Sequence, residues 1–310
     1  MKITSEDEKG KIWFNGEMVD WKDATVHVMS HALHYGSSMF EGMRCYQTEK
    51  GSAIFRLKDH IRRLFDSAKI FRYKIPYTRE QIEQACIEVI KINKMTSAYL
   101  RPLVFRGYGA MGVDPSESPI DVIVGALNWG KYLGEEAVTK GVEVVISSWN
   151  RIGPNSLPSL AKAGGNYMNS QLIRMEANSL GYPEGIALDR WGHISEGSGE
   201  NIFIIRDGVI YTPSIGSSLL PGLTRDCAIK IAKEFDFTLV ETAIPREMIY
   251  ICDEAFFTGT AAEVTPIRAV DQIQIGEGRR GPITEKIQQR LFDYIEGRIE
   301  DKYNWLTYIS

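Results

Sequence analysis

The apolar positions in the N-terminal third of the chain predict a strand followed by two amphipathic helices. Residues 53–57 are typical of a strand, and apolar side chains then recur at the i, i+4, i+7 spacing that places them on one face of a helix. This stripe consists of Leu57, Ile61, Leu64, Phe65, Ala68 and Phe71. A second helix is expected to start at Thr78, because Thr78 and Gln81 match the capping-box pattern. Its inward positions are Ile82, Cys86, Val89 and Ile90.

The later patterns predict further strands and helices in mixed order. Strands are expected over residues 99–105, 121–127 and 142–147. The apolar run at 121–127 is continuous, which predicts a strand buried along its whole length. A hairpin with a type I′ turn is expected at Asp207 and Gly208. Helices are expected over about 224–235 and 284–298, the latter amphipathic through Ile287, Leu291, Tyr294 and Ile295.

The segment 128–134 interrupts these patterns, since it combines two glycines with aromatic residues and has neither a strand nor a helix period. We interpret residues 128–137 as an interdomain loop. It separates a small N-terminal domain, residues 1–127, from a larger C-terminal domain, residues 138–310. A length of 310 residues suits two domains of ordinary size. The predicted fold class is therefore α+β with two domains.

Composition and charge narrow the function classes. A formal net charge of -4 gives no basic footprint for nucleic acid, and no apolar stretch approaches the ~18 residues of a membrane span. The N-terminus is acidic and lacks the apolar core of a secretory signal. The four cysteines are scattered without CxxC spacing, which favours a reducing cytoplasm over a disulfide framework. We expect a cytoplasmic protein that binds neither nucleic acid nor membrane.

Lys162 and Glu196 are the first candidates for chemistry. Lys162 has only alanine and glycine as immediate neighbours, and Tyr167 follows five positions later. Glu196 lies in a Gly-rich segment that leads into the apolar run 202–205. An aldehyde cofactor needs an accessible amine, and a protonated pyridine nitrogen needs a carboxylate partner. A lysine beside glycines is more commonly a surface turn, but its pairing with the glutamate segment favours a cofactor site.

Two Gly-Thr turns could bind a phosphate. The segment 220–226 leads directly into a predicted helix, whose first N–H groups and dipole favour an anion. The segment 258–263 follows the apolar strand end 255–257 and places small residues and hydroxyls where backbone amides could also bind an anion. Each turn alone is more often a helix N-cap or a simple β-turn. Neither matches a dinucleotide or Walker loop.

His27, His31 and His34 have a spacing that could suggest a metal site, but no cysteine or carboxylate accompanies them before Glu41. We expect them to hydrogen-bond a turn and predict no metal site. Tyr99 and Arg101 alternate on a predicted strand, so their side chains share one face. A phenol beside a guanidinium fork can bind a carboxylate, although a simple surface pair of the two side chains is the alternative.

These segments together resemble the branched-chain amino acid aminotransferases of the fold-type IV pyridoxal-phosphate enzymes. The segments that carry the resemblance are 12–16, 35–42, 99–102, 162–167, 195–197, 220–222 and 258–260. The Tyr-x-Arg-Pro strand at 99–102 and the Phe-Glu-Gly segment at 40–42 point to the branched-chain members in particular. The resemblance implies a fold like that of D-amino acid aminotransferase, with a small α/β N-terminal domain and a larger, mixed pseudo-barrel C-terminal domain.

The resemblance implies that Lys162 binds pyridoxal 5'-phosphate as a Schiff base and moves the proton between Cα and C4′. It implies that Glu196 pairs with the pyridine nitrogen and that Tyr167 hydrogen-bonds the phenolic oxygen. The residues it places around the phosphate are Arg63, Leu223, Thr224 and Thr260, and it adds Leu220 and Gly259 as further cofactor-binding residues. Helical periodicity does not distinguish Arg62 from Arg63, so the motif match alone selects Arg63.

The same resemblance implies a ping-pong transamination between L-leucine, L-isoleucine or L-valine and 2-oxoglutarate. It places Tyr99 and the backbone amides of Thr260 and Ala261 at the substrate α-carboxylate. The side-chain pocket is expected to consist of Tyr35, Phe40, Met111, Val113, Trp129, Tyr132 and Tyr167. Arg101, with the phenols of Tyr35 and Tyr132, is expected to bind the γ-carboxylate of glutamate. In this family, Tyr35 and Val113 come from a neighbouring subunit, which implies a homodimer or a hexamer of three dimers.

Two kinds of alternative stay open at this point. D-amino acid aminotransferases and aminodeoxychorismate lyases share the lysine chemistry but bind carboxylates differently, and the strand at 99–102 argues against them. A non-catalytic protein that stores pyridoxal phosphate is the other alternative. The presence of Glu196, Tyr167 and the aromatic pocket residues argues against it.

Overall fold

The computed structural model describes residues 3–128 and 136–309, and their contacts form two compact units. Unit 1 contains the described residues of 1–129, 161–165 and 294–310, and unit 2 contains those of 130–160 and 166–293. The sequence predicted a single boundary, with domains at 1–127 and 138–310 on either side of a loop at 128–137. In the structure, two later segments, 161–165 and 294–310, also belong to unit 1. Ala163 bridges Met39, and the last strand pairs with residues 53–55.

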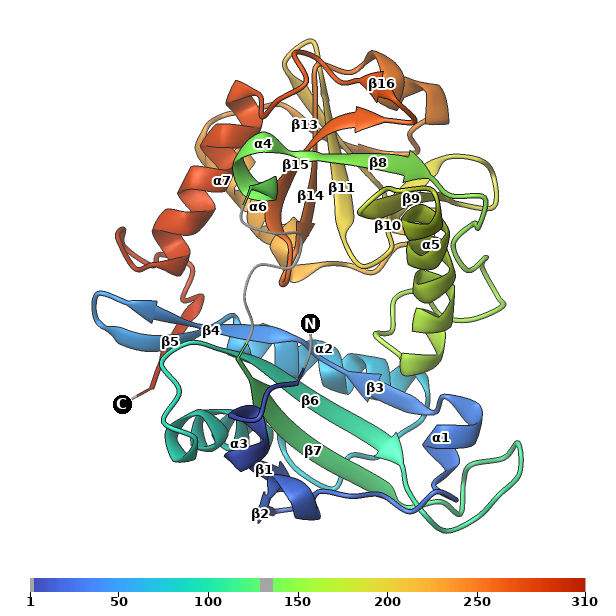
Figure 1. Ribbon diagram of the computed structural model, residues 1–310, viewed down its shortest axis with the longest axis vertical. Helices are drawn as coiled ribbons and strands as arrows, with labels where there is room; N and C mark the ends of the chain where they lie inside the picture. Colours follow the sequence, from blue (N-terminus) through green and yellow to red (C-terminus); the bar gives the residue numbers. More distant parts are fainter. Residues whose placement is uncertain (1–2, 129–135, 310) are drawn as a thin grey trace. The chain divides into compact units, whose positions relative to one another are not determined.

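An eight-stranded antiparallel sheet forms the centre of unit 1 (Figure 1), in the order β17-β5-β4-β6-β7-β1-β2 with β3 also paired to β6. Its strands are β1 (Lys11–Phe14), β2 (Glu17–Asp20), β3 (Ser38–Phe40), β4 (Met43–Thr48), β5 (Gly51–Phe55), β6 (Ala98–Arg106), β7 (Ile120–Leu127) and β17 (Leu306–Tyr308). The helices are α1 (His31–Tyr35), α2 (Leu57–Ile70) and α3 (Arg79–Ile92), with 3-10 turns at Asp7–Lys9 and Trp21–Asp23.

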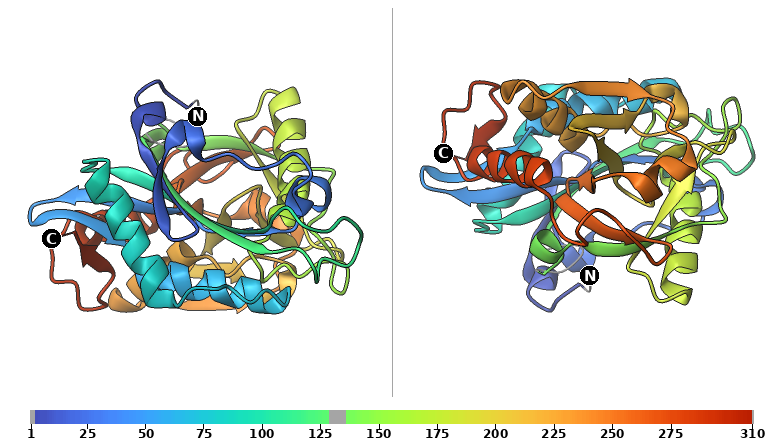
Figure 2. Two further views of the ribbon diagram at one scale, coloured as in Figure 1. Left: turned by 90° about the horizontal axis from the view of Figure 1, so that it is seen from below. Right: turned by 90° about the horizontal axis from the view of Figure 1, so that it is seen from above.

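Helices α2 and α3 confirm the periodicity of the sequence. Both lie on one side of the unit 1 sheet (Figure 2), and their buried side chains join one core cluster with those of the strands. The predicted capping box is present, since Gln81 N–H donates to Thr78 Oγ1 and the Gln81 side chain accepts from Thr78 N–H. The prediction for 121–127 was partly wrong. Strand β7 alternates between buried and half-buried positions, because the side chains of one face join the core with α3 and those of the other do not.

A nine-stranded mixed sheet forms the centre of unit 2, in the order β10-β9-β8-β15-β14-β11-β12-β13 with β16 paired to β15. Its strands are β8 (Val142–Ile146), β9 (Glu184–Leu188), β10 (Ile194–Gly197), β11 (Asn201–Arg206), β12 (Val209–Pro213), β13 (Leu239–Thr242), β14 (Glu254–Gly259), β15 (Glu263–Val270) and β16 (Ile273–Gln274). Strand β8 runs parallel to β9 and β15, and β12 runs parallel to β13. This mixture of helices with largely antiparallel sheets confirms the α+β class.

The helices that begin in unit 2 are α4 (Ala137–Lys140), α5 (Tyr167–Ser179), α6 (Leu223–Glu234) and α7 (Pro282–Ile295), with 3-10 turns at Ile215–Ser217 and Arg246–Ile251. A further 3-10 turn, Gly164–Asn166, begins in unit 1 and leads into α5. The predicted hairpin is confirmed: Asp207 and Gly208 both have positive φ, as a type I′ turn requires, and Arg206 pairs with Val209. Helix α5 was not predicted from the sequence. Among the described residues, no helix combines the length and apolar character needed to cross a membrane.

Candidate active site

Lys162 is anchored in unit 1 through its main chain. Its N–H donates to Ser67 Oγ on α2 at 3.0 Å, and its carbonyl accepts from the Phe40 N–H of β3, also at 3.0 Å. The neighbouring Ala163 forms a bridge with Met39. The Lys162 Nζ lies 4.8 Å from the centre of the Phe40 ring. The lysine main chain is therefore fixed from both sides while its side chain extends along an aromatic face.

The glycines that follow this lysine pack closely against neighbouring segments. A Cβ at Gly164 would lie 2.3 Å from Ser38 Oγ, and Gly165 N–H donates to the carbonyl of Gly36 at 3.1 Å. Gly36 itself has a φ of 65°, in the left-handed region that favours glycine. The small residues that first distinguished this segment in the sequence thus serve close packing of the segment against α1 and β3.

A buried ion-pair cluster on α2 orients Arg63. Glu41 is fully buried, and its two oxygens accept from Arg63 Nε at 2.6 Å and Arg63 Nη2 at 2.8 Å. Glu41 also accepts from His60 Nδ1 at 2.7 Å. Burial opposes ionisation of Glu41, but the Arg63 charge and its hydrogen bonds hold the pKa of this carboxyl well below its usual range. Burial lowers the pKa of His60, which is therefore a neutral donor at pH 7.

The two adjacent arginines of α2 have different environments. The Arg62 side chain is 68% exposed and lies 3.9 Å from Asp66, whereas the Arg63 side chain is 13% exposed and bound by Glu41. A phosphate-binding guanidinium must be held in one orientation, because its bidentate geometry is directional. Of the two arginines, Arg63 is the one that is held in a fixed orientation.

Tyr99 and Arg101 lie on the same face of β6, as predicted. Arg101 Nη2 donates to the Tyr99 phenol at 3.2 Å, and the Arg101 guanidinium lies 4.7 Å from the centre of the Phe40 ring. Gly42 makes room for the phenol, since a Cβ at this position would lie 1.8 Å from Tyr99 Oη. Phe40, Tyr99 and Arg101 therefore form one cluster in which a cation is held by aromatic surface.

The three histidines bind turn backbone and side chains, as predicted. His31 contacts Ser37 Oγ at 2.7 Å and the Gly112 carbonyl at 2.8 Å, which ties α1 to the loop that carries Met111 and Val113. His34 contacts the Val28 carbonyl at 2.9 Å, and the Met29 N–H donates to His27 Nδ1. Within the described residues, no group of three or more His, Cys, Asp and Glu side chains could hold a metal ion.

Glu196, at the end of β10 in unit 2, is held by three donors. Its Oε1 lies 2.8 Å from Arg151 Nη2, and its Oε2 accepts from Asn201 Nδ2 at 3.2 Å and from Leu220 N–H at 3.1 Å. Glu196, Arg151 and Asn201 are all buried. A buried carboxylate with a charged donor on one oxygen and two neutral donors on the other is stabilised in its ionised form. Glu196 can therefore face a protonated ring nitrogen as an anion.

Arg151 and Asn201 were not identified from the sequence as site residues. Asn201 Nδ2 also donates to the Leu220 carbonyl at 2.9 Å, and a Cβ at Gly222 would lie 2.0 Å from Asn201 Oδ1. Arg151 is positioned by α5, where its Nη1 donates to Asn169 Oδ1 at 2.7 Å. Asn201 lies in the Gly-rich segment that drew attention to Glu196, whereas nothing near Arg151 in the sequence signals its partner.

The two predicted phosphate turns lie at one end of the unit 2 sheet. Helix α6 begins at Leu223 after Gly222, which has no side chain to cap the helix N-terminus. Strand β14 ends at Gly259, and its Thr258 pairs with Asn201, which in turn binds Leu220. Among the described residues, the buried Thr258 Oγ1 has no hydrogen-bond partner. This end of the sheet thus combines backbone donors, a hydroxyl and the Glu196 carboxylate.

A family model described as amino-transferase class IV matches residues 38–270, more than half of the chain. The chain belongs to this family. The branched-chain-amino-acid aminotransferase of Escherichia coli strain K12 is 54% identical over 300 residues, which cover 96% of this chain and 97% of that protein.

Solved structures agree with this assignment. A crystal structure of the Escherichia coli branched-chain amino acid aminotransferase matches with a TM-score of 0.96 and 53% identity, covering 97% of this chain and 100% of the other. The branched-chain aminotransferase of the thermophilic archaeon Thermoproteus uzoniensis, solved with norvaline, matches with a TM-score of 0.92 and 39% identity, covering 97% of this chain and 99% of the other. A third branched-chain amino acid aminotransferase, complexed with N-(5'-phosphopyridoxyl)-L-glutamate, matches with a TM-score of 0.94 and 44% identity over 100% of both chains. The fold is that of the fold-type IV aminotransferases.

The predicted residues of this class IV aminotransferase divide between the units. Unit 1 contains Tyr35, Phe40, Arg63, Tyr99, Arg101, Met111, Val113 and Lys162. Unit 2 contains Tyr167, Glu196, Leu220, Leu223, Thr224, Gly259, Thr260 and Ala261. The structure brings together Lys162, Phe40 and Arg101 in unit 1, and Glu196 and Leu220 in unit 2. Trp129 and Tyr132 lie outside the described residues.

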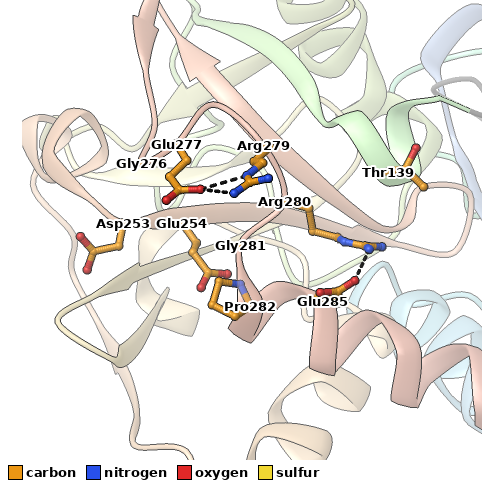
Figure 3. Close-up of a pocket in the computed structure, with 10 residues that line it drawn as sticks. All are labelled: Thr139, Asp253, Glu254, Gly276, Glu277, Arg279, Arg280, Gly281, Pro282 and Glu285. Carbon is orange, nitrogen blue, oxygen red and sulfur yellow. Dashed lines mark hydrogen bonds and ion pairs between the residues drawn. The ribbon is translucent and has the colours of Figure 1, made fainter.

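Unit 2 of this class IV aminotransferase also has a pocket that is lined mainly by charged residues and glycines and contains none of the predicted site residues (Figure 3). It measures about 710 Å³ and lies around the start of α7 in unit 2. Its arginines are paired internally, Arg279 with Glu277 and Arg280 with Glu285. The N–H groups of Ile283 and Thr284 donate to Glu254. These contacts fix the α7 N-terminus.

Proposed function

We propose that the chain is a branched-chain-amino-acid aminotransferase that exchanges the amino group of L-leucine, L-isoleucine or L-valine with 2-oxoglutarate. Sequence identity of 54% with the Escherichia coli enzyme over nearly the whole of both chains supports this activity. The relative that was solved with the phosphopyridoxyl-glutamate adduct is also known with 4-methylvaleric acid, a branched apolar acid. A single enzyme of this type therefore accepts both kinds of side chain.

The observation that carries the proposal is the environment of the buried Glu196 carboxylate. Arg151, Asn201 and the Leu220 N–H donate to it and so favour its ionised form. The donor chemistry around it fits pyridoxal 5'-phosphate: an anion for the ring nitrogen, and for the phosphate the start of α6, which no side chain caps. When bound, this cofactor would withdraw electrons from the substrate α-carbon and carry the amino group between substrates. Related structures were solved with pyridoxamine 5'-phosphate or the adduct.

On this proposal, Lys162 supplies the amine and later transfers the proton at the substrate α-carbon. Ser67 and Phe40 hold its main chain, so that only the flexible side chain has to move. Glu196 binds the ring nitrogen, and Tyr167 at the start of α5 binds the phenolic oxygen. The phosphate is assigned to Arg63 and to the turns around Leu220, Leu223, Thr224, Gly259 and Thr260.

Substrate recognition is assigned to the cluster around Phe40. Tyr99, with the amides of Thr260 and Ala261, is proposed to bind the α-carboxylate. Arg101 is proposed to bind the second carboxylate of glutamate, and its packing against the Phe40 ring supplies the apolar surface that a branched side chain needs. Placing a cation against an aromatic face lets one pocket accept both a charged and an apolar side chain.

We further propose that the enzyme is cytoplasmic and at least a homodimer, either as a dimer or as a hexamer of three dimers. Apolar side chains in and near α1 and in the loop 106–118 are exposed: Val28, Leu33, Tyr35, Tyr108, Met111 and Val113. Val113, which is 87% exposed, is a pocket residue that a neighbouring subunit would contribute. The four cysteines all lie in the described part of the chain, are buried and form no disulfide, which supports a reducing compartment.

The test is a spectral titration of the purified, cofactor-loaded protein with L-leucine, L-isoleucine, L-valine, L-glutamate, D-amino acids and (R)-amines. The proposal predicts conversion to the pyridoxamine form with the L-amino acids and recovery with 2-oxoglutarate. Conversion by D-amino acids alone would indicate the D-amino acid aminotransferase alternative. A spectrum that no amino acid changes would indicate a protein that only stores the cofactor.

A further inference from the structure

Two buried carboxyl groups lie against the turn that connects Glu196 to Asn201. Glu184 on β9 is fully buried, and Glu200 is 4% exposed. Glu184 Oε1 accepts from Ser198 N–H at 3.3 Å, and Glu200 Oε2 accepts from Gly199 N–H at 3.1 Å. Because Ser198 and Gly199 are consecutive, the two carboxyl groups bind adjacent amides of the same turn.

The turn is packed too closely to change shape without cost. Gly197 N–H donates to the Glu200 carbonyl at 2.6 Å, and a Cβ at Gly197 would lie 2.8 Å from Glu200 Oε2. On the other side, a Cβ at Gly259 would lie 3.5 Å from Glu200 Cγ. The Glu200 side chain therefore fills the space between the Glu196 turn and the end of β14, where the predicted phosphate turn begins.

The charges in this cluster do not balance if both glutamates are ionised. The charged groups that act on Glu200 are Glu184 and Arg174 of α5, and the Arg174 guanidinium is paired with Glu184 Oε2. Glu184 already accepts from Gly185 N–H at 2.8 Å. Burial, then the charge of Glu184, raises the pKa of Glu200 well above its usual value. Both carboxyl groups are buried against one turn and Arg174 pairs with Glu184, so one proton on the two carboxyl groups balances their charge against this guanidinium.

We propose that Glu200 and Glu184 share one proton, with Glu200 as the neutral acid, and that this pair positions Glu196 and Asn201 by holding the amides of Ser198 and Gly199. Neither glutamate touches the reacting atoms, so both are positioning residues. The part of the inference that concerns the cofactor rests on the proposed role of Glu196. The proton-sharing itself does not.

The first test is infrared spectroscopy of the cofactor-free protein at about pH 7.5. We expect a carbonyl stretching band of a neutral carboxylic acid that is lost in Glu200→Gln and kept in Glu247→Gln, a matched change at an exposed position. A wild-type spectrum without this band would overturn the proposal, whether or not any variant folds. A band that persists in Glu200→Gln would also overturn it.

The second test is thermal unfolding of the same proteins between about pH 6 and pH 9. The folded-state pKa of Glu200 is raised, so the native protein retains a proton that the unfolded chain loses above its own carboxyl pKa. The stability of wild type therefore falls as the pH rises toward the folded-state pKa. Glutamine keeps a donor and an acceptor but cannot ionise. As the pH rises across this range, the melting temperature of Glu200→Gln relative to that of wild type should increase by at least about 2 °C. Parallel pH profiles would contradict the proposal.

The third test measures cofactor affinity by fluorescence titration of the cofactor-free proteins with pyridoxal phosphate. Glu200→Ala, which removes both donor and acceptor, should weaken binding about 5- to 10-fold, whereas Glu200→Gln should remain near wild type. Equal affinity of all three proteins would refute the positioning role. Glu196→Gln is titrated in parallel: an unchanged affinity there would count against the proposed function, not against the shared proton.

Discussion

Replacing Arg101 with leucine should separate the two substrates of the enzyme. The guanidinium lies 4.7 Å from the Phe40 ring centre and 5.2 Å from the Tyr99 ring centre, and it donates to the Tyr99 phenol. Leucine keeps apolar contact with both rings but removes the charge. The loss should therefore fall on the substrate that carries a second carboxylate, L-glutamate or 2-oxoglutarate, and leave L-leucine binding nearly unchanged.

The magnitude follows from the type of interaction that is lost. A hydrogen bond to a charged group contributes about 1.5–3 kcal/mol, which corresponds to a differential of roughly 10- to 150-fold in the dissociation constant. Because Arg101 is half-buried on β6, its contribution should lie above that of a solvent-exposed pair. Arg101→Lys keeps the charge without the fork and should show an intermediate differential.

Each half-reaction is measured separately by the spectral change of the cofactor, with L-leucine in one series and L-glutamate in the other. Arg62→Leu, at an exposed position of α2 in the same unit, serves as the matched control and should alter neither constant. Equal losses for both substrates would mean that Arg101 holds the α-carboxylate, and the reasoning about a dual-purpose pocket would be refuted.

Two further variants test other parts of the site. Glu196→Gln leaves a hydrogen-bond acceptor but no anion in the cradle of Arg151 and Asn201, and the rate of α-proton removal from L-valine should fall at least ~10²-fold in single-turnover experiments; an unchanged rate would remove Glu196 from the site. Glu41→Gln should destabilise the protein by about 3–5 kcal/mol in urea unfolding at pH 7, because the largely buried Arg63 loses its partner. Since the pKa of Glu41 is depressed in the folded state, its contribution is present above the unfolded-state pKa near 4 and is lost as the pH falls, so the two unfolding curves should converge in acid; a difference that is constant with pH would contradict this account of Glu41.

The elements that the sequence predicted well are those with strong local signals. Helix α3 has a capping box and an apolar stripe, and the hairpin at Asp207 has the residues that positive φ requires. Helix α5 lacks such a signal: its buried positions are Ser170, Ile173 and Ala177, which include one large apolar side chain, while methionines at 168 and 175 are exposed. Small inward residues suit the close approach of α5 to β9, where Gly185 faces Ile173, but they leave no stripe in the sequence.

The candidate site residues come from segments with sequence motifs, whereas the residues that hold them in place do not. Lys162, Glu196, Tyr99 and Arg101 lie in segments whose local composition is unusual. Arg151 holds Glu196, and Glu41 holds Arg63. The partners in each pair are distant in sequence, and no spacing rule connects them. The return of residues 161–165 to unit 1 has the same origin, because it depends on a bridge between Ala163 and Met39.

The central claim is that Lys162 carries pyridoxal phosphate. Reduction of the loaded protein with borohydride converts the C=N bond between lysine and cofactor into a stable amine, and peptide mass spectrometry then locates the phosphopyridoxyl group. We predict the label on the peptide that contains Lys162, and its absence, together with the loss of visible absorbance and turnover, in Lys162→Ala. A label on another lysine, or near-normal transamination by Lys162→Ala, would contradict the assignment.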